Sequence, residues 1–134
     1  ARADDKTQLV YGLDRLNERK KAYVVEGPFD SLFLPNCMAM ASSDLFRVSR
    51  LGIDFADIVY VFDNEPRNKE IVKLITKAAS KGNKIVIWPD TMKEKDINDM
   101  ILSGKTREEI ITMIDDNTYH GLEAELKVSQ WSKV

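Results

Sequence analysis

The chain has 134 residues, of which 43% are apolar and 31% are charged, and its formal net charge is −2. This composition is typical of one globular domain and excludes a disordered chain, a fibrous repeat and a uniformly basic nucleic-acid-binding surface. No apolar run approaches the roughly 20 residues that span a bilayer, so we expect a cytoplasmic protein without a membrane partner. The lone Cys37 predicts a buried thiol rather than a disulfide or a zinc site.

Short apolar runs alternate with longer amphipathic ones, which is the pattern of strand–helix–strand units in an α/β fold. We expect a mainly parallel central sheet of about four strands flanked by helices. The strands are predicted at residues 22–25, 37–41, 57–62 and 84–88. The helices are predicted at residues 28–34, 45–50, 71–81, 96–103 and 106–116.

Several helix boundaries carry a local sequence signal. Pro28 suits a first helical turn because it lacks the N–H that would have no partner there. Gly82 stands where a helix commonly ends in a left-handed residue. Thr106 and Glu109 have the spacing of a capping box, so we expect a helix to begin directly after Thr106.

Acidic residues follow three of the predicted strands. They are Glu26, Asp30, Asp63, Glu65 and Asp96. Asp63 and Glu65 alternate in an extended segment and should project to one side, while Asn64 points away. Because the carboxyl ends of parallel strands meet at the edge where open α/β sheets bind ligands, we expect these acids to gather there.

Gathered carboxylates repel one another and destabilise a fold unless a cation lies among them. Mg²⁺ prefers a few carboxylates together with water and phosphate oxygens, and paired ions stabilise both the attacking and the leaving oxygen in phosphoryl transfer. Each acidic motif alone is more often a solvated loop. Their combination, each after a buried strand, therefore favours metal-assisted nucleotide chemistry.

The segment Glu26-Gly27-x-x-Asp30, followed by Asp63-x-Glu65 after a second strand, resembles the toprim signature of primases, topoisomerases and some nucleases. This resemblance implies a toprim fold and a metal-dependent nucleotidyl or phosphodiester reaction. The usual second motif has aspartate at both ends, whereas Glu65 takes the second place here. Whether Glu65 is a direct metal ligand is therefore left open.

Further segments narrow the resemblance. Tyr11-Gly12-Leu13 is similar to the segment that precedes the toprim strand in bacterial-type primases. Residues 25–33, 62–67 and 95–100 resemble the primase subunit of T-even-type bacteriophages. On this reading, the chain divides into the end of an RNA-polymerase segment (1–21), a toprim catalytic domain (22–118), and a C-terminal tail (119–134) that packs on the domain or a partner.

The resemblance implies synthesis of RNA primers from ribonucleoside triphosphates on single-stranded DNA, with two Mg²⁺ or Mn²⁺ ions. It also implies a replicative hexameric helicase as partner, in the cytoplasm of a host cell. Primases of this class carry upstream segments, including a zinc-binding module, so we expect this chain alone to prime weakly or not at all.

The resemblance and the local chemistry together assign candidate roles. Glu26, Asp63 and Glu65 are the catalytic candidates, and metal binding is assigned to these three together with Asp30 and Asp96. Phosphate or nucleotide contacts are assigned to Arg15, Arg67, Lys93 and Lys95. Template contacts are assigned to Arg19, Lys20 and Lys21. Pairing with nearby acids explains the basic residues about equally well.

Two other functions remain open. A toprim nuclease would use the same acids with water as the nucleophile, and a non-catalytic nucleotide-binding α/β module would bind one metal ion at most. Trp88 should lie in the core, whereas Trp131 could stack on bases or pack on the domain. His120 has no visible chemical partner and is expected at the surface.

Overall fold

A single sheet organises the part of the chain that the structure describes. This computed structural model describes residues 10–11, 21–40 and 57–134. The strands are β1 (Val10–Tyr11), β2 (Lys21–Val25), β3 (Cys37–Met40), β4 (Asp57–Val61), β5 (Lys84–Val86) and β6 (Thr118–Tyr119). The helices are α2 (Pro28–Ser31), α3 (Lys69–Ser80), α4 (Ile97–Leu102), α5 (Arg107–Asp116) and α6 (Gly121–Trp131).

The strands lie in the order β1-β3-β2-β4-β5-β6. The four inner strands run parallel, and Val24 of β2 lies opposite Met38 on one side and Tyr60 on the other. The two-residue strands β1 and β6 pair antiparallel at the edges, and the apolar pattern does not predict them. The expected α/β fold with a mainly parallel sheet is confirmed, and it is consistent with a toprim-like fold.

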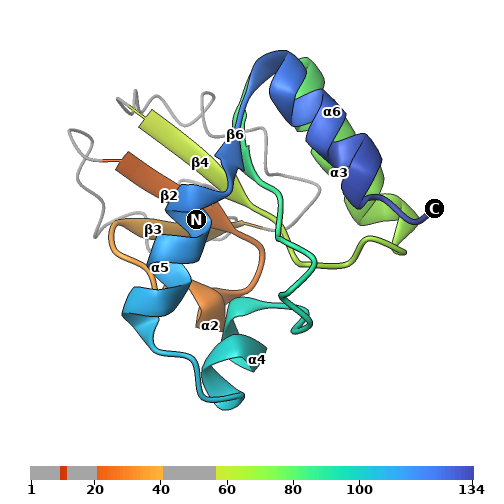
Figure 1. Cartoon of the computed structure of the whole chain (residues 1–134). Helices are drawn as coiled ribbons and strands as arrows, with labels where there is room; N and C mark the ends of the chain where they lie inside the picture. The colour runs from red at the N-terminus through yellow and green to blue at the C-terminus, as the bar shows by residue number, and fades with distance from the viewer. Residues whose placement is uncertain (1–9, 12–20, 41–56) are drawn as a thin grey trace.

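Helices cover both faces of the sheet (Figure 1). Successive residues of a strand point to opposite faces, so Ala22 and Val24 face α3 and α6, while Tyr23 and Val25 face α4 and α5. Both faces of β2 are therefore buried, which explains its continuous apolar run.

The predicted end of α3 and the predicted start of α5 agree with the structure, whereas α3 begins at Lys69, two residues earlier than expected. The side chain of Asn68 caps α3 by accepting from the backbone N–H groups of Glu70 and Ile71. Gly82, with φ of 80°, follows its C-terminal end. The capping box of α5 is present, with Glu109 N–H donating to Thr106 Oγ1 at 3.1 Å and Thr106 N–H donating to Glu109 Oε1 at 2.8 Å.

The first predicted helix is shorter than expected. α2 ends at Ser31 rather than near Leu34. Its supposed apolar face is mostly outside the core, because Phe29 is 72% exposed and Leu32 is 50% exposed, and only Leu34 is buried. The expected helix at residues 45–50 lies outside the described residues.

The C-terminal segment contains a helix that the sequence pattern does not reveal. In α6, Ala124, Val128 and Trp131 are buried in the same cluster as Ile75 and Ala79 of α3. Figure 1 shows α6 running alongside α3 on one face of the sheet. In the described part of the chain, no helix combines the length and the apolar character needed to cross a membrane.

Candidate metal site

The acidic residues meet where the connections of the sheet change direction. From β2 the chain passes to β3 on one side, whereas from β4 it passes to β5 on the other side. β2 and β4 are neighbours, so their carboxyl ends frame the switch point at which open α/β sheets bind ligands. Glu26 directly follows β2, and Asp63 lies just beyond β4.

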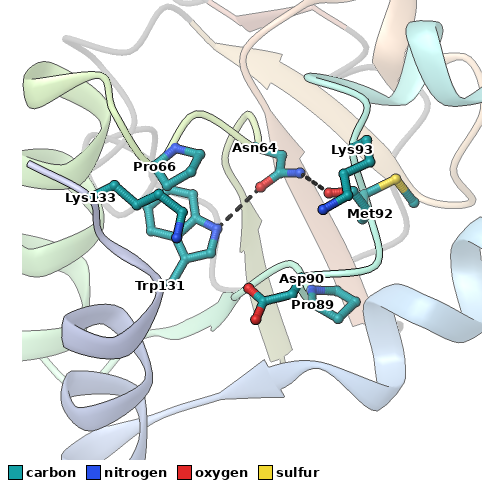
Figure 2. Close-up of a pocket in the computed structure, with 8 residues that line it drawn as sticks. All are labelled: Asn64, Pro66, Pro89, Asp90, Met92, Lys93, Trp131 and Lys133. Atoms are coloured by element: carbon teal, nitrogen blue, oxygen red, sulfur yellow. Dashed lines mark hydrogen bonds between the residues drawn. The ribbon is translucent and has the colours of Figure 1, made fainter.

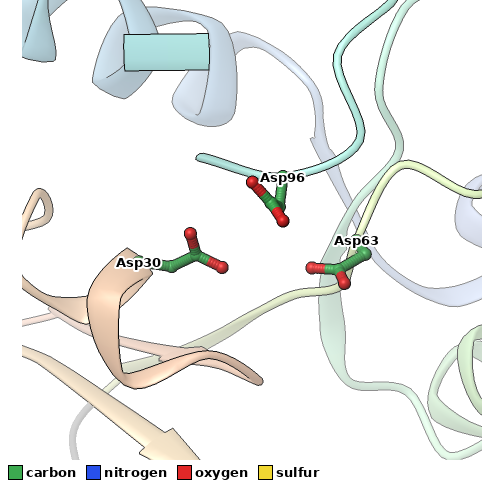
Figure 3. Close-up of side chains that lie close together, drawn as sticks. All are labelled: Asp30, Asp63 and Asp96. Atoms are coloured by element: carbon green, nitrogen blue, oxygen red, sulfur yellow. The ribbon is translucent and has the colours of Figure 1, made fainter. Parts of the chain in front are cut away.

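Three aspartates come together at this point. One carboxylate oxygen from each of Asp30, Asp63 and Asp96 lies within 4.8 Å of the others. Figure 3 shows the three side chains pointing toward one another, from α2, from the loop after β4, and from the residue before α4. We call these residues the acidic triad.

The start of α4 holds two members of the triad. Asp96 caps this helix, with its Oδ1 accepting from the backbone N–H of Asp99 at 2.8 Å. Asp30 Oδ1 accepts from the backbone N–H of Asn98 at 2.9 Å. Two N–H groups that would lack partners inside the helix are thus used to orient carboxylates.

Gly27 provides the space that Asp30 occupies. Its backbone is extended, with φ of −94° and ψ of 132°, so no left-handed conformation requires a glycine there. A Cβ atom at this position would lie 3.0 Å from Asp30 Oδ2. The close approach of Asp30 is therefore the structural reason for a glycine at position 27.

Ionisation of two members of the triad, Asp63 and Asp30, is disfavoured. Burial, followed by the charges of Glu26, Asp30, Asp96 and Glu65, raises the pKa of Asp63 from 3.8 to about 7. Burial also raises the pKa of Asp30 to about 6, although the hydrogen bond from Asn98 opposes this rise. Although Asp30 is only 5% exposed, its pKa rises less than that of Asp63, because the hydrogen bond from Asn98 and the charge of Lys95 both lower it.

Glu26 lies beside the triad and is incompletely satisfied. Burial and the charge of Glu65 are the main causes that raise its pKa, and a hydrogen bond from the backbone N–H of Asp63 lowers it. Its Oε1 atom is buried and has no hydrogen-bond partner among the described residues. Unpaired buried oxygen and mutually repelling carboxylates are features that a hard divalent cation would relieve, so the donor set fits Mg²⁺ or Mn²⁺.

The acids that meet in the structure are not the three that the sequence analysis gives as catalytic candidates. Asp30 and Asp96 meet Asp63, whereas Glu65 is not among the three acids and lies close enough to Glu26 to raise its pKa. Asp63 and Glu65 therefore both lie near Glu26, but only Asp63 meets Asp30 and Asp96.

The basic candidates are distributed unevenly. Lys95 lies near enough to Glu26 and Asp30 to lower the pKa of both. Arg67 and Lys93 are exposed on the loops that follow β4 and β5. Lys21 is at the opposite end of β2, where its ammonium group pairs with Asp115 at 2.9 Å. The remaining candidates, Arg15, Arg19 and Lys20, lie outside the described residues.

Asn64 joins three segments of the chain at the edge of the site. The sequence motifs do not predict this role. Its side chain bonds to backbone carbonyls and to Trp131 rather than to a member of the triad. Its Nδ2 donates to the carbonyls of Met92 (2.9 Å) and Glu94 (3.1 Å), its Oδ1 accepts from Trp131 Nε1 (3.1 Å), and its N–H donates to the Lys95 carbonyl (2.6 Å). We call this set of bonds the Asn64 clamp.

A cavity of about 420 Å³ adjoins the clamp. Figure 2 shows it between Asn64, Trp131 and the loop of Asp90 to Lys93, with Lys133 at the rim. Two lysines and one aspartate give this cavity a positive excess, in contrast to the acidic triad.

The two tryptophans and Cys37 are buried, so they serve the packing of the domain. Trp88 is in the core as expected, and its Nε1 donates to the carbonyl of Phe62 at 2.9 Å. Trp131 is only 6% exposed, so in this conformation its ring packs on the domain rather than offering a base-stacking surface. Cys37 is buried as expected, and His120 is exposed.

Comparison with known proteins agrees with the predicted resemblance. The chain is 36% identical over 128 residues to the DNA primase of Enterobacteria phage T4, and the match covers 93% of this chain. The same match covers 36% of the phage protein, so the chain spans about a third of the length of this curated relative. No protein-family model matches the chain. The chain is thus related to a T4-type phage DNA primase over nearly all of its length.

Proposed function

We propose that the chain is the metal-binding catalytic core of a DNA primase. The observation that carries this proposal is the meeting of Asp30, Asp63 and Asp96 at the switch point of the sheet, in a chain related to a phage primase. The relative is named as a DNA primase, and the chain corresponds to about a third of it. The activity of the whole relative is therefore part of the proposal.

The proposed cofactor is Mg²⁺ or Mn²⁺, with two ions bound. We assign Asp30, Asp63 and Asp96 to one ion and Glu65, beside Glu26, to the second. Bound ions of this kind neutralise the triphosphate and lower the pKa of the attacking hydroxyl group. Two observations support a cation here. Glu26 Oε1 has no hydrogen-bond partner in the described part of the chain, and the pKa values of Glu26 and Asp63 are raised.

The proposed reaction joins two ribonucleotides opposite a single-stranded DNA template. The 3′-oxygen of one ribonucleotide forms a bond to the α-phosphorus of an incoming nucleoside triphosphate, and the bond to the pyrophosphate group breaks. The hydroxyl proton must leave the attacking oxygen. We assign Glu26 to proton acceptance or to metal binding at that oxygen. Its pKa is raised, and one of its carboxylate oxygens has no hydrogen-bond partner among the residues that the structure describes.

Basic residues around the site are proposed to bind phosphate. Lys95 is the strongest candidate, since it is close enough to Glu26 and Asp30 to influence their pKa values. Lys93 and Arg67 are exposed nearby, and Arg15 is retained from the sequence motif. Arg19, Lys20 and Lys21 are retained as template contacts, although the pairing of Lys21 with Asp115 reduces its availability.

Primer synthesis tests the proposal directly. The assay would use this chain alone and joined to the upstream segments that primases of the resembled class carry, with ribonucleoside triphosphates, Mg²⁺ and single-stranded DNA. We expect Glu26→Gln and Asp63→Asn each to reduce synthesis at least about a hundredfold. Asp90→Asn is the matched control, because Asp90 is exposed and lies outside the acidic triad. Undiminished synthesis by both site variants would refute the assignment.

The same samples separate the competing functions. Metal-dependent cleavage of DNA or RNA without primer synthesis would identify a toprim nuclease. Nucleotide binding that survives Asp63→Asn, with neither synthesis nor cleavage, would identify a non-catalytic nucleotide-binding module. A helicase partner and a location in the host cytoplasm remain proposals that rest on the resemblance.

A further inference from the structure

We propose that Asn64 is a positioning residue for the acidic triad, and that the C-terminal helix α6 acts on the triad through Trp131. This inference rests on the proposed function, because it gives the clamp a role in metal binding. The Asn64 side chain makes no bond to the triad, but the hydrogen bonds of Asn64 join the two segments that carry Asp63 and Asp96.

The clamp fixes the distance between two loops. Asp63 precedes Asn64 directly, and Asp96 directly follows Lys95, whose carbonyl accepts from the Asn64 backbone N–H at 2.6 Å. The Asn64 side chain also donates to the carbonyls of Met92 and Glu94, which lie earlier in the same loop. Repulsion between Asp63 and Asp96 would push these loops apart, and the clamp opposes that movement.

Trp131 determines which way the Asn64 amide faces. An indole N–H can only donate, so it requires the side-chain oxygen of Asn64 as its partner, at 3.1 Å. The amide nitrogen is then directed at the two loop carbonyls. Without the indole N–H, the amide could turn and place its oxygen against those carbonyls, with loss of both bonds.

The helix that carries Trp131 is anchored firmly enough to serve as a support. Ala124 and Val128 are buried with Trp131 against α3. Beyond the helix, the backbone N–H of Lys133 donates to the Pro66 carbonyl at 2.8 Å, which ties the chain end to the same loop as Asn64. The C-terminal segment therefore contacts the loop after β4 at Asn64 and at Pro66. Figure 2 shows the first of these contacts, between Trp131 and Asn64.

Binding of Mn²⁺ by titration calorimetry tests the inference. One hydrogen bond contributes a factor of roughly 3 to 10, so we expect Trp131→Phe to weaken Mn²⁺ binding about threefold and Asn64→Leu at least about tenfold. The double variant should bind like Asn64→Leu alone, because Trp131 acts through Asn64. Asn117→Leu is the matched control, since Asn117 also donates its amide to a carbonyl, that of Met113 at 2.8 Å, away from the triad.

Amide hydrogen exchange provides a readout that needs no metal. The Asn98 N–H donates a hydrogen bond to Asp30, and we expect Asn64→Leu and Trp131→Phe to accelerate its exchange. The control Asn117→Leu should leave this exchange rate unchanged. If the unaltered chain fails to bind Mn²⁺, the proposed function is wrong and the exchange result alone decides the role of the clamp. Unaltered exchange at Asn98 in both variants, or a double variant whose effects simply add, would overturn the inference.

Discussion

Replacing Asp63 by asparagine should stabilise the metal-free protein. The Asp63 carboxyl has its pKa raised from 3.8 to about 7, mainly by burial and then by neighbouring carboxylates. At about 1.36 kcal/mol per pH unit this rise corresponds to roughly 4 kcal/mol for a fully shielded group. Asp63 is partly exposed, so water screens the repulsion and we expect about 1 to 2 kcal/mol at pH 8.

The gain should depend on pH with a defined sign. Because the folded-state pKa lies above the unfolded value, this carboxyl favours folding most below about pH 4. That contribution is lost as the pH rises toward about 7. The uncharged amide of Asp63→Asn has no such loss. The difference in unfolding free energy should therefore be small at pH 4, grow through pH 5 to 7 and level off above.

Thermal and urea unfolding with chelator present measure this difference. At pH 8 we expect the variant to melt roughly 3 to 8 °C above the unaltered chain. Asp90→Asn, at an exposed position outside the triad, should change the unfolding free energy by less than about 0.5 kcal/mol. Excess Mg²⁺ should reverse the order by stabilising only the unaltered chain. A variant less stable than the unaltered chain at pH 8 without metal would refute the reasoning.

Three further predictions follow from the same geometry. Gly27→Ala should weaken Mn²⁺ binding about tenfold without loss of helical circular dichroism, because its Cβ would lie 3.0 Å from Asp30 Oδ2; unchanged affinity would contradict this. Mn²⁺ affinity should fall as the pH drops from about 8 to about 5.5, since Asp63 (pKa about 7) and Asp30 (about 6) must release protons, and calorimetry in two buffers should detect that release. Thr106→Ala should cost about 1 kcal/mol of unfolding free energy through loss of the α5 cap, with Mn²⁺ binding unchanged.

The fold and part of the site could be predicted because they depend on local patterns. Continuous apolar runs identified the parallel strands, and parallel strands must end at a common edge. The approach of Glu26 and Asp63 follows from that rule alone, because β2 and β4 are neighbours. Asp96 is different, since it lies well beyond the end of β5 and reaches the triad only through the path of its loop.

The α6 helix lacked the signals that mark a helix start. Its N-cap residue His120 makes no side-chain cap hydrogen bond, and Gly121 has φ of 65°. Its apolar pattern is also blurred, because Leu122 is 84% exposed and Leu126 is 58% exposed. The role of Asn64 was hidden for a related reason. Its partners include three loop carbonyls and an indole far along the chain, and carbonyls carry no sequence signal.

The hydrogen bonds of the site indicate where a cation would contribute most. Asp30 and Asp96 each accept a backbone N–H at the start of α4, and Glu26 accepts the N–H of Asp63. Among the described residues, the Asp63 carboxylate accepts no hydrogen bond, and its pKa rises further than that of Asp30. The protein thus supplies a backbone donor for Glu26, Asp30 and Asp96 and leaves Asp63 to be neutralised by something else. Among substitutions of the site acids, Asp63→Asn should therefore cause the largest gain in metal-free stability. It should also cause the largest loss of metal binding, because it removes the carboxylate that depends most on a metal ion.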